Sequence, residues 1–597
     1  MSAHRDLPAH SAPASSRFAL ALAGLKQPVF QLVLVMALTL AGRLFYVLFT
    51  GFATDDAFIT FRYAHMLAEG QGFVYNPGER VYGTTTPLFT FLIAGWLLIS
   101  GSSPLVGARL VEMIAAMGAS AFTYLAVRRL GGSLLQQTLA GLSLGLCISQ
   151  WSHDTNGMET ALLPCLMAAS WFALAAKQYT WAGILCGLLL WTRLDTILWP
   201  LALTFAALFE DRRAAIRMGL IAAAMYSPWL IFASIYFGSP IPHTVAAKIA
   251  AYTQNNATSF FANTWTVIKY LTPIPVSPAR PGFLILVASL TLSLAGIHAW
   301  RSRRSILQLA LVFFALLELI RLAISGATFF NRYFVPLLWA VLTLAAQGLG
   351  YFWEQLKPSN RPAIGWLAFW LSTAITAAFG ALLPIGSGSN APSLADSYVV
   401  VSLWLLLFPF LLLLFSNFKR RGRPAHWAGL AALALTLVFF SIAAGRQLLP
   451  SLRFIRASQI YRGERSLQAM GQWLAVNSPP GATVLLEPLG YVGYYSNRVM
   501  RDEVGLVTPD VTRLKQAGNL DVYDYLEELR PDYVIQHCDD ILEWQRREPP
   551  EQNLLIRNYR MAKQFNPLAF DPVSGYNSET DFGPISRQSC YEIWEKK

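Results

Sequence analysis

The sequence predicts a polytopic α-helical membrane protein with about 13 transmembrane helices, followed by a C-terminal α/β domain. The 597 residues are 54% hydrophobic and only 13% charged, whereas soluble domains carry about 25% charged residues. Long apolar stretches recur up to about residue 445, and Lys and Arg gather in the short loops between them, as the positive-inside rule requires. The remaining residues alternate polar and apolar segments, as a soluble domain does.

The basic clusters predict a topology with the N-terminus inside and the C-terminus outside. We expect a cytoplasmic tail over 1–27, a transmembrane domain over 28–445 and an extracytoplasmic α/β domain over 446–597. The stretch 180–209 is one long kinked helix or two short ones, and only two helices keep the following basic cluster inside. The other spans whose limits the sequence indicates are 28–50, 106–127, 135–151, 158–176, 217–237, 281–300 and 427–444.

The formal net charge of +12 does not indicate a nucleic-acid partner. The basic residues lie in short loops between apolar spans, where the positive-inside rule places them. We therefore expect a lipid bilayer and no nucleic acid as the partner of this charge.

The first outer loop, residues 51–105, carries the adjacent carboxylates Asp55 and Asp56 directly after the first span. Acidic residues near a membrane are costly and tend to mark a functional site. They precede an apolar helix, so they are placed at its positive dipole end. N-capping is the alternative role for either residue. The short apolar segment TPLFTFLIAGWLLIS, later in the same loop, is predicted to lie in the membrane interface.

Further polar residues are predicted on the outer face. The turn-rich segment YNPGERVYGTTTPL either lines a site or is a solvated connector. Arg193 and Asp195 interrupt an apolar stretch, where a mutual salt bridge is their simplest role, and Glu318 and Arg321 are spaced to pair on one helix. His243, Lys248 and Arg332 are predicted outer-face cations. Each alone could face the lipid headgroups, and together they suit a lipid phosphate.

The C-terminal segment predicts helices near 464–476 and 520–530 and strands at ATVLLE, DYVIQH, YRMAKQF and SCYEIWE. Cys538 ends one of these strands and Cys590 begins another, so a disulfide between them is a hypothesis for an oxidising compartment. The sequence contains no HExxH, CxxC, Walker, GxSxG or usable GxGxxG motif, which argues against a nucleotide-driven pump. We expect no cofactor and no dedicated metal site, and a metal requirement stays open.

Nearly the whole chain resembles the GT-C superfamily of integral-membrane glycosyltransferases, in its branch of bacterial arabinofuranosyltransferase-like and mannosyltransferase-like enzymes. The most specific stretch is DDAFITFRYAHMLAEGQGFVYNPGERVYGTTTPL. Shorter and weaker matches are NGMETALL, WTRLDTILWP, YFGSPIPHTVAAKI, FNRYFVPLL and GYVGYYSNRVMRDEVGLVTPD.

The resemblance implies an inverting transferase in the bacterial cytoplasmic (inner) membrane, with its site on the extracytoplasmic side. The donor would be a sugar on a polyprenyl phosphate, with arabinofuranose as the first candidate, and the acceptor a cell-envelope glycan, lipid or protein. Asp55 and Asp56 would be the catalytic carboxylates, with Asp56 preferred as the base. His243, Lys248 and Arg332 would bind the donor phosphate. The residues implied to bind substrate are Arg62, Tyr63, Asn76, Glu79, Thr84, Thr85, Thr86, Glu159, Arg193 and Asp195.

Two groups of alternatives remain open from the sequence. A transporter or flippase of lipid-linked substrates would also use outer cations, although the chain shows no inverted repeat. Within the enzyme class, a mannosyltransferase, an oligosaccharyl ligase or a polymer ligase fits the same residues.

Overall fold

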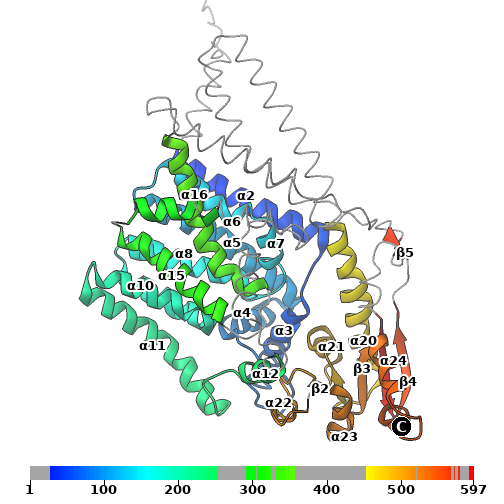
Figure 1. Cartoon of the computed structure of the whole chain (residues 1–597). Coiled ribbons are helices and arrows are strands. Elements are labelled where there is room, and N and C mark those ends of the chain that lie inside the picture. The colour runs from blue at the N-terminus through cyan, green and yellow to red at the C-terminus, as the bar shows by residue number, and fades with distance from the viewer. Residues whose placement is uncertain are drawn as a thin grey trace, which may run out of the picture.

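The computed structural model describes residues 27–252, 291–292, 294–303, 305–324, 331–355, 452–519, 521–566, 570–571, 576–577 and 590–597. Figure 1 shows a bundle of helices, coloured blue to green, beside a C-terminal unit of helices and strands, coloured yellow to red. Four helices lie where the two parts meet: α3 (Asp55–Ala68), α12 (His243–Tyr252), α21 (Leu489–Ser496) and α22 (Pro509–Gln516). The contacts pair α3 with α21 and α12 with α22.

The helical bundle begins with α2 (Pro28–Thr50), which has a proline in its first turn and ends at Gly51 in the left-handed conformation. Helix α5 packs against α2, α6 and α8, while α9 packs against α8 and α11. The remaining helices of this part are α3 (Asp55–Ala68), α4 (Pro87–Ser100), α5 (Pro104–Arg129), α6 (Leu134–Gly145), α7 (Ile148–His153), η1 (Glu159–Ala161), α8 (Leu162–Ala175), α9 (Tyr179–Thr192), η2 (Leu194–Ile197), α10 (Leu198–Leu208), α11 (Arg212–Tyr236), α12 (His243–Tyr252), α15 (Ile306–Ile324), η3 (Asn331–Phe334) and α16 (Val335–Gln355).

These helices can be compared with the predicted spans. Within the described residues, four helices are long and apolar enough to cross a membrane: Pro28–Thr50, Pro104–Arg129, Arg212–Tyr236 and Arg332–Tyr351. The stretch 180–209 forms two helices, α9 and α10, which meet at Arg193 and η2. The predicted interfacial segment is the 14-residue helix α4. The predicted tail 1–27, except for its last residue, the span 427–444 and most of the span 281–300 lie outside the described residues.

The C-terminal unit contains a five-stranded mixed sheet with the order β2-β1-β3-β7-β4. Strand β1 (Thr483–Leu486) is parallel to β2 (Val499–Asp502) and β3 (Tyr533–His537), while β7 (Tyr591–Lys596) is antiparallel to β3 and to β4 (Tyr559–Phe565). The four strands that the sequence predicts correspond to β1, β3, β4 and β7, and β2 was not predicted. A separate strand pair joins β5 (Phe570–Asp571) and β6 (Tyr576–Asn577).

The C-terminal unit also contains helices. The chain enters through η4 (Gln459–Gln468), a π-helix that continues into α20 (Ala469–Asn477). Between β1 and β2 lies α21 (Leu489–Ser496). The other helices are α22 (Pro509–Gln516), η5 (Val522–Asp524), α23 (Tyr525–Leu529), α24 (Cys538–Arg547) and α25 (Leu554–Asn558).

The two faces of the sheet are buried against different partners, because successive side chains of a strand point to opposite faces. Leu485 and Val534 pack with α23, α24 and α25 in a core of the C-terminal unit. Val484 and Ile535 belong to a second core, which also contains Phe58 of α3. The outer loop and one face of the sheet therefore share one hydrophobic core, and the C-terminal unit is packed onto the bundle.

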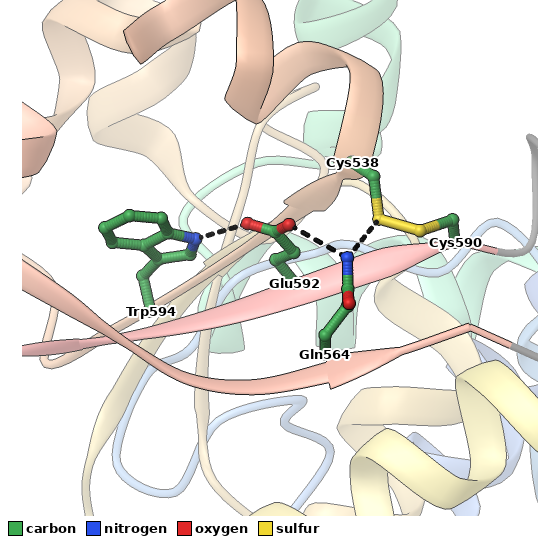
Figure 2. Close-up of a disulfide and its surroundings, with 5 residues drawn as sticks. All are labelled: Cys538, Gln564, Cys590, Glu592 and Trp594. Atoms are coloured by element: carbon green, nitrogen blue, oxygen red, sulfur yellow. Dashed lines mark hydrogen bonds between the residues drawn. A yellow bond between two sulfur atoms is a disulfide. The ribbon is translucent and has the colours of Figure 1, made fainter.

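Cys538, at the start of α24, and Cys590, just before β7, form a disulfide, as hypothesised from the sequence. Figure 2 shows this disulfide beside the amide of Gln564, which also donates a hydrogen bond of 3.2 Å to Glu592. The Trp594 indole donates to the other oxygen of Glu592 at 2.9 Å. The disulfide joins the end of β3 to the start of the neighbouring strand β7.

Glu503, which directly follows β2, is a buried carboxyl group of this unit, 9% exposed, and it accepts a hydrogen bond from Gln536 of β3. Burial raises the pKa of Glu503 from 4.5 to about 8. The folded protein therefore keeps a proton that the unfolded chain releases in this pH range. The contribution of Glu503 to stability is fully present below pH 4.5 and is lost as the pH rises towards about 8.

We predict that Glu503→Gln removes this pH dependence, because glutamine does not ionise. Between about pH 5 and about pH 8, the melting temperature of the wild type should fall by several degrees relative to that of the variant. Thermal unfolding in detergent across this range measures the difference. The exposed Glu528→Gln variant should follow the wild type, and parallel curves for wild type and Glu503→Gln would contradict the prediction.

Candidate active site

A cavity of about 360 Å³ lies where the outer loop, the bundle and the C-terminal unit meet. The outer loop contributes residues 52–56 at the start of α3 and residues 83–86 before α4. The bundle contributes Lys248 of α12 and Arg332 of η3, among others. The C-terminal unit closes the remaining side with residues between 458 and 506. Of the predicted site residues, Asp55, Asp56, Thr84, Thr85, Thr86, Lys248 and Arg332 line this cavity.

The two adjacent aspartates have different partners. Asp55 accepts hydrogen bonds from the backbone N–H groups of Gly490 at 2.9 Å and Tyr491 at 2.8 Å, which belong to the first turn of α21. Burial raises the pKa of the Asp55 carboxyl to about 7, while these two hydrogen bonds act in the opposite direction. Asp55 thus satisfies free donors of a helix N-terminus in another part of the chain. Its contacts are those of an anchoring residue.

Asp56 instead forms an ion pair with Arg332, with 2.6 Å between a carboxylate oxygen and a guanidinium nitrogen. The Asp56 side chain is 35% exposed and the Arg332 side chain 14% exposed. Asp56 therefore presents a carboxylate to the cavity beside a cation. Of the two aspartates, it is the one in a position to take a proton from a bound molecule.

Three cations surround Tyr333, the residue after Arg332. The ammonium group of Lys248 donates a hydrogen bond to the phenol oxygen at 3.1 Å. The guanidinium carbon of Arg193 lies 4.4 Å from the ring centroid and that of Arg332 lies 5.7 Å from it. Cations and an aromatic face attract one another, so Tyr333 holds these like charges near one another at the edge of the cavity. Such a concentration of positive charge suits an anionic group.

Arg193 belongs to a buried ion network next to this cluster. It donates to both carboxylate oxygens of Asp195, at 2.9 and 2.5 Å, and lies 3.4 Å from a carboxylate oxygen of Glu159. Glu318 and Arg321 of α15 pair at 2.8 Å, as their spacing predicts. Arg193, Asp195 and Glu159 do not themselves line the cavity. Their observed contacts orient Arg193 against Tyr333, and substrate contact by these three residues stays a prediction.

The threonines before α4 form a compact hydroxyl cluster on the cavity wall. The hydroxyl oxygens of Thr84 and Thr86 lie 3.2 Å apart, and the backbone N–H of Thr86 donates to the Thr84 hydroxyl at 3.4 Å. Thr60 of α3 lies 3.5 Å from the same Thr86 hydroxyl, while Thr85 is exposed. These hydroxyls can hydrogen-bond a polar ligand next to Asp56.

Four other predicted residues of the outer loop do not line the cavity, and three of them, Arg62, Asn76 and Glu79, contact the C-terminal unit. Arg62 donates to the backbone carbonyls of Tyr75, Gly493 and Arg498. Glu79 pairs with both terminal nitrogens of Arg501, at 3.0 and 2.8 Å. Two hydrogen bonds of 3.0 Å join the Asn76 amide to the backbone of Met500, and Tyr63 accepts from Gly83 and donates to Val81. Arg62, Asn76 and Glu79 are therefore interface residues, whereas Tyr63 forms its hydrogen bonds within the outer loop. The predicted role of all four in binding substrate stays a prediction.

His243, at the start of α12, also faces the C-terminal unit. Its Nε2 lies 3.0 Å from the Thr512 hydroxyl of α22, and its backbone N–H donates to Tyr82. Burial lowers the pKa of His243, so it is the least cationic of the three predicted phosphate ligands. It does not line the cavity, whereas Lys248 and Arg332 do.

The sequence did not single out the cavity residues of the C-terminal unit, such as Gln459, Arg462 and Glu487. Glu487 directly follows β1, and a polar residue at the carboxyl end of a parallel strand was a usable signal. The π-helix that carries Gln459 and Arg462 has no sequence signature of this kind. In the part of the chain that the structure describes, no group of three or more His, Cys, Asp or Glu residues is arranged to hold a metal ion.

Comparison with solved structures places this geometry in a known fold. The structure of ArnT from Cupriavidus metallidurans bound to undecaprenyl phosphate matches with a TM-score of 0.54 and 16% sequence identity, covering 87% of this chain and 95% of that chain. The apo structure of the same protein matches with a TM-score of 0.54 and 17% identity, over 86% of this chain and 93% of that chain. The chain shares the fold of ArnT. At this level of sequence identity, the likeness shows the fold alone.

Two further comparisons concern the sequence. Residues 453–594 match the family model described as a domain of unknown function (DUF8728), which covers the C-terminal unit. No curated protein matches the chain. The likeness to ArnT is therefore one of fold, and the chemistry of the cavity has to be argued from its own residues.

We predict that Asp55→Ala destabilises the protein more than Asp56→Ala does, because it leaves two buried N–H groups of α21 without their acceptor. The loss should be about 2 kcal/mol, with a lower melting temperature in detergent. Asp55→Asn, which keeps one acceptor oxygen, should fall between wild type and Asp55→Ala. Equal losses for the two alanine variants would rule out the anchoring role of Asp55.

Proposed function

We propose that the protein is an inverting membrane glycosyltransferase that moves a sugar from a polyprenyl-phosphate donor to a hydroxyl group of a cell-envelope acceptor. The observation that carries the proposal is a carboxylate and two cations in one cavity: Asp56 faces Arg332 at 2.6 Å, and Lys248 lines the same space. The fold shared with ArnT, one of whose structures contains undecaprenyl phosphate, supports a lipid-phosphate donor. Arabinofuranose is the first sugar to test.

In the proposed reaction, different residues of the cavity bind the donor and accept the proton. Lys248 and Arg332 bind the donor phosphate, and Asp56 accepts the proton of the acceptor hydroxyl. The acceptor oxygen bonds to the anomeric carbon while the bond from that carbon to the phosphate oxygen breaks. The electron pair stays on the polyprenyl phosphate, whose additional negative charge the two cations stabilise. A single displacement of this kind inverts the anomeric centre.

Arg332 links donor binding to the state of the base. It pairs with Asp56, and a donor phosphate competes with Asp56 for the same guanidinium group. Donor binding would therefore release the Asp56 carboxylate from its ion pair and leave it available to the acceptor hydroxyl.

We predict that Asp56→Asn inserts and melts like the wild type but loses transfer by a factor of about 10² to 10⁴, because asparagine cannot take the proton. The assay uses purified protein in detergent, radiolabelled polyprenyl-phosphate arabinofuranose and a mixed envelope extract. The matched control is Glu69→Gln, an exposed carboxylate directly after α3, and this variant should keep its activity. Normal turnover by Asp56→Asn would remove Asp56 from the role of base.

The donor site has its own prediction. Lys248→Ala should raise the Kd for undecaprenyl phosphate about tenfold, because it removes a charge-assisted contact to the phosphate. Thermal stabilisation by undecaprenyl phosphate measures this, with the uncharged alcohol undecaprenol as the control ligand. Lys563→Ala, on the exposed strand β4, should bind like the wild type. Equal binding of phosphate and alcohol would contradict the phosphate site and favour a transporter of lipid-linked substrates.

A further inference from the structure

The C-terminal unit forms a large part of the cavity wall. Eleven of the 26 residues that line the cavity belong to it. They come from the π-helix η4 and the residue before it, from the turn between β1 and α21, from the first turn of α21, and from the loop after β2. Lys248 and Arg332 do not belong to this wall, because they come from the bundle.

Two features of this wall are typical of ligand sites. In open α/β sheets, ligands bind at the carboxyl ends of parallel strands, and Glu487 directly follows β1, which is parallel to both of its neighbours. π-Helical turns within helices occur frequently at functional sites, and η4 supplies Gln459, Arg462 and Gly463 to the cavity. The sheet edge and the π-helix therefore meet at the same space.

The wall is held next to the acid pair. Asp55 binds the N-terminal turn of α21 through Gly490, three residues after Glu487. Glu487, Asp55 and Asp56 all line the same cavity. Groups bound at Glu487 are therefore close to Asp56, where the proposed proton transfer takes place.

Arg462 and Glu487 are the charged groups of this wall. Glu487 is exposed and Arg462 half-buried, and within the described residues neither forms an ion pair. Both side chains line the same cavity. Gln459 is fixed between α21 and the segment before α3, because its amide donates to Tyr491 at 2.9 Å and accepts from Ala53 at 3.1 Å.

The composition of the wall indicates the ligand. Arg462 offers hydrogen-bond donors, Glu487 offers acceptors, and Ser458 can do both. Glu487 and Arg462 carry opposite charges, so this wall has no net charge that would favour an anionic or a cationic group. Leu467 and Leu489 add apolar surface of the kind that a sugar ring can cover. An uncharged molecule with several hydroxyl groups satisfies all of these requirements.

We infer that Arg462 and Glu487 form the acceptor subsite of this cavity and bind an uncharged, polyhydroxylated sugar. The inference rests on the proposed function for its role in catalysis, but the binding itself is a separate property. The C-terminal unit then selects the acceptor, and the bundle binds the donor.

The test is binding of neutral octyl glycosides (glucoside, galactoside, mannoside and arabinofuranoside) to the full-length protein in detergent, measured by saturation-transfer NMR. Octyl glucuronide and an octyl glucosaminide are the anionic and cationic comparisons. Wild type should bind at least one neutral glycoside better than either charged one. Arg462→Ala and Glu487→Gln should each weaken this binding about tenfold or more, because a hydrogen bond to a charged group is lost.

Two controls match these variants. Arg465→Ala, on the same π-helix but packed on Tyr461, and Glu528→Gln, on the exposed surface of α23, should bind as the wild type does. Each variant is also tested for thermal stabilisation by undecaprenyl phosphate, which should be unchanged because Lys248 and Arg332 are intact. Melting temperatures close to that of the wild type show that the variants fold.

The outcomes separate this inference from the proposed function. No binding of any neutral glycoside, stronger binding of a charged one, or wild-type glycoside binding by both variants would overturn the subsite. Weakened stabilisation by undecaprenyl phosphate in Arg462→Ala or Glu487→Gln would also overturn it, because the residues would then serve the donor. Loss of glycoside binding with undecaprenyl phosphate binding intact supports it. Failure of wild type to bind undecaprenyl phosphate would instead contradict the proposed donor site.

Discussion

The position of α21 against α3 is the contact on which the cavity depends. Asp55 accepts hydrogen bonds from two backbone N–H groups at the N-terminus of α21, and such groups have no partner within their own helix. The approach requires glycine at position 490, because a Cβ there would overlap with the backbone carbonyl of Asp55. The same applies to Gly493, where a Cβ would overlap with the Tyr75 hydroxyl. Two small residues and one carboxylate thus bring the C-terminal unit to the site.

The surrounding interface reinforces this contact with groups of several kinds. Phe58 of α3 stacks on Tyr491 with ring centroids 3.8 Å apart, inside the shared hydrophobic core. The side chain of Arg62 is also buried in this interface. It donates to the backbone carbonyls of Tyr75 in the outer loop and Arg498 in the C-terminal unit. Because a buried charge is costly without partners, these contacts favour one relative position of loop and sheet. The cavity is a consequence of that position, since Asp55 and the two residues of α21 that it binds are 435 and 436 residues apart in sequence.

The charges of the cavity are arranged by the same packing. Asp56 and Arg332 face each other, and Tyr333 holds Lys248 and Arg193 nearby. The positive charge therefore gathers on the bundle side, while the C-terminal wall carries one charge of each sign. This asymmetry is the physical basis for assigning an anionic donor to one side and a neutral acceptor to the other.

The sequence by itself determined the membrane-protein class, the acid pair and the ion pairs within single segments, such as Arg193 with Asp195 and Glu318 with Arg321. These features follow from composition, hydrophobic runs and local spacing, which need no knowledge of distant contacts. Only the tertiary structure decided that Asp55 anchors α21 while Asp56 faces Arg332, and that Arg62, Asn76 and Glu79 bind the C-terminal unit. Neighbouring side chains on a helix point in different directions, and their partners come from residues far away in the chain. The cavity wall of Arg462 and Glu487 was hidden for the same reason, because a site between two distant segments exists only once they are packed together.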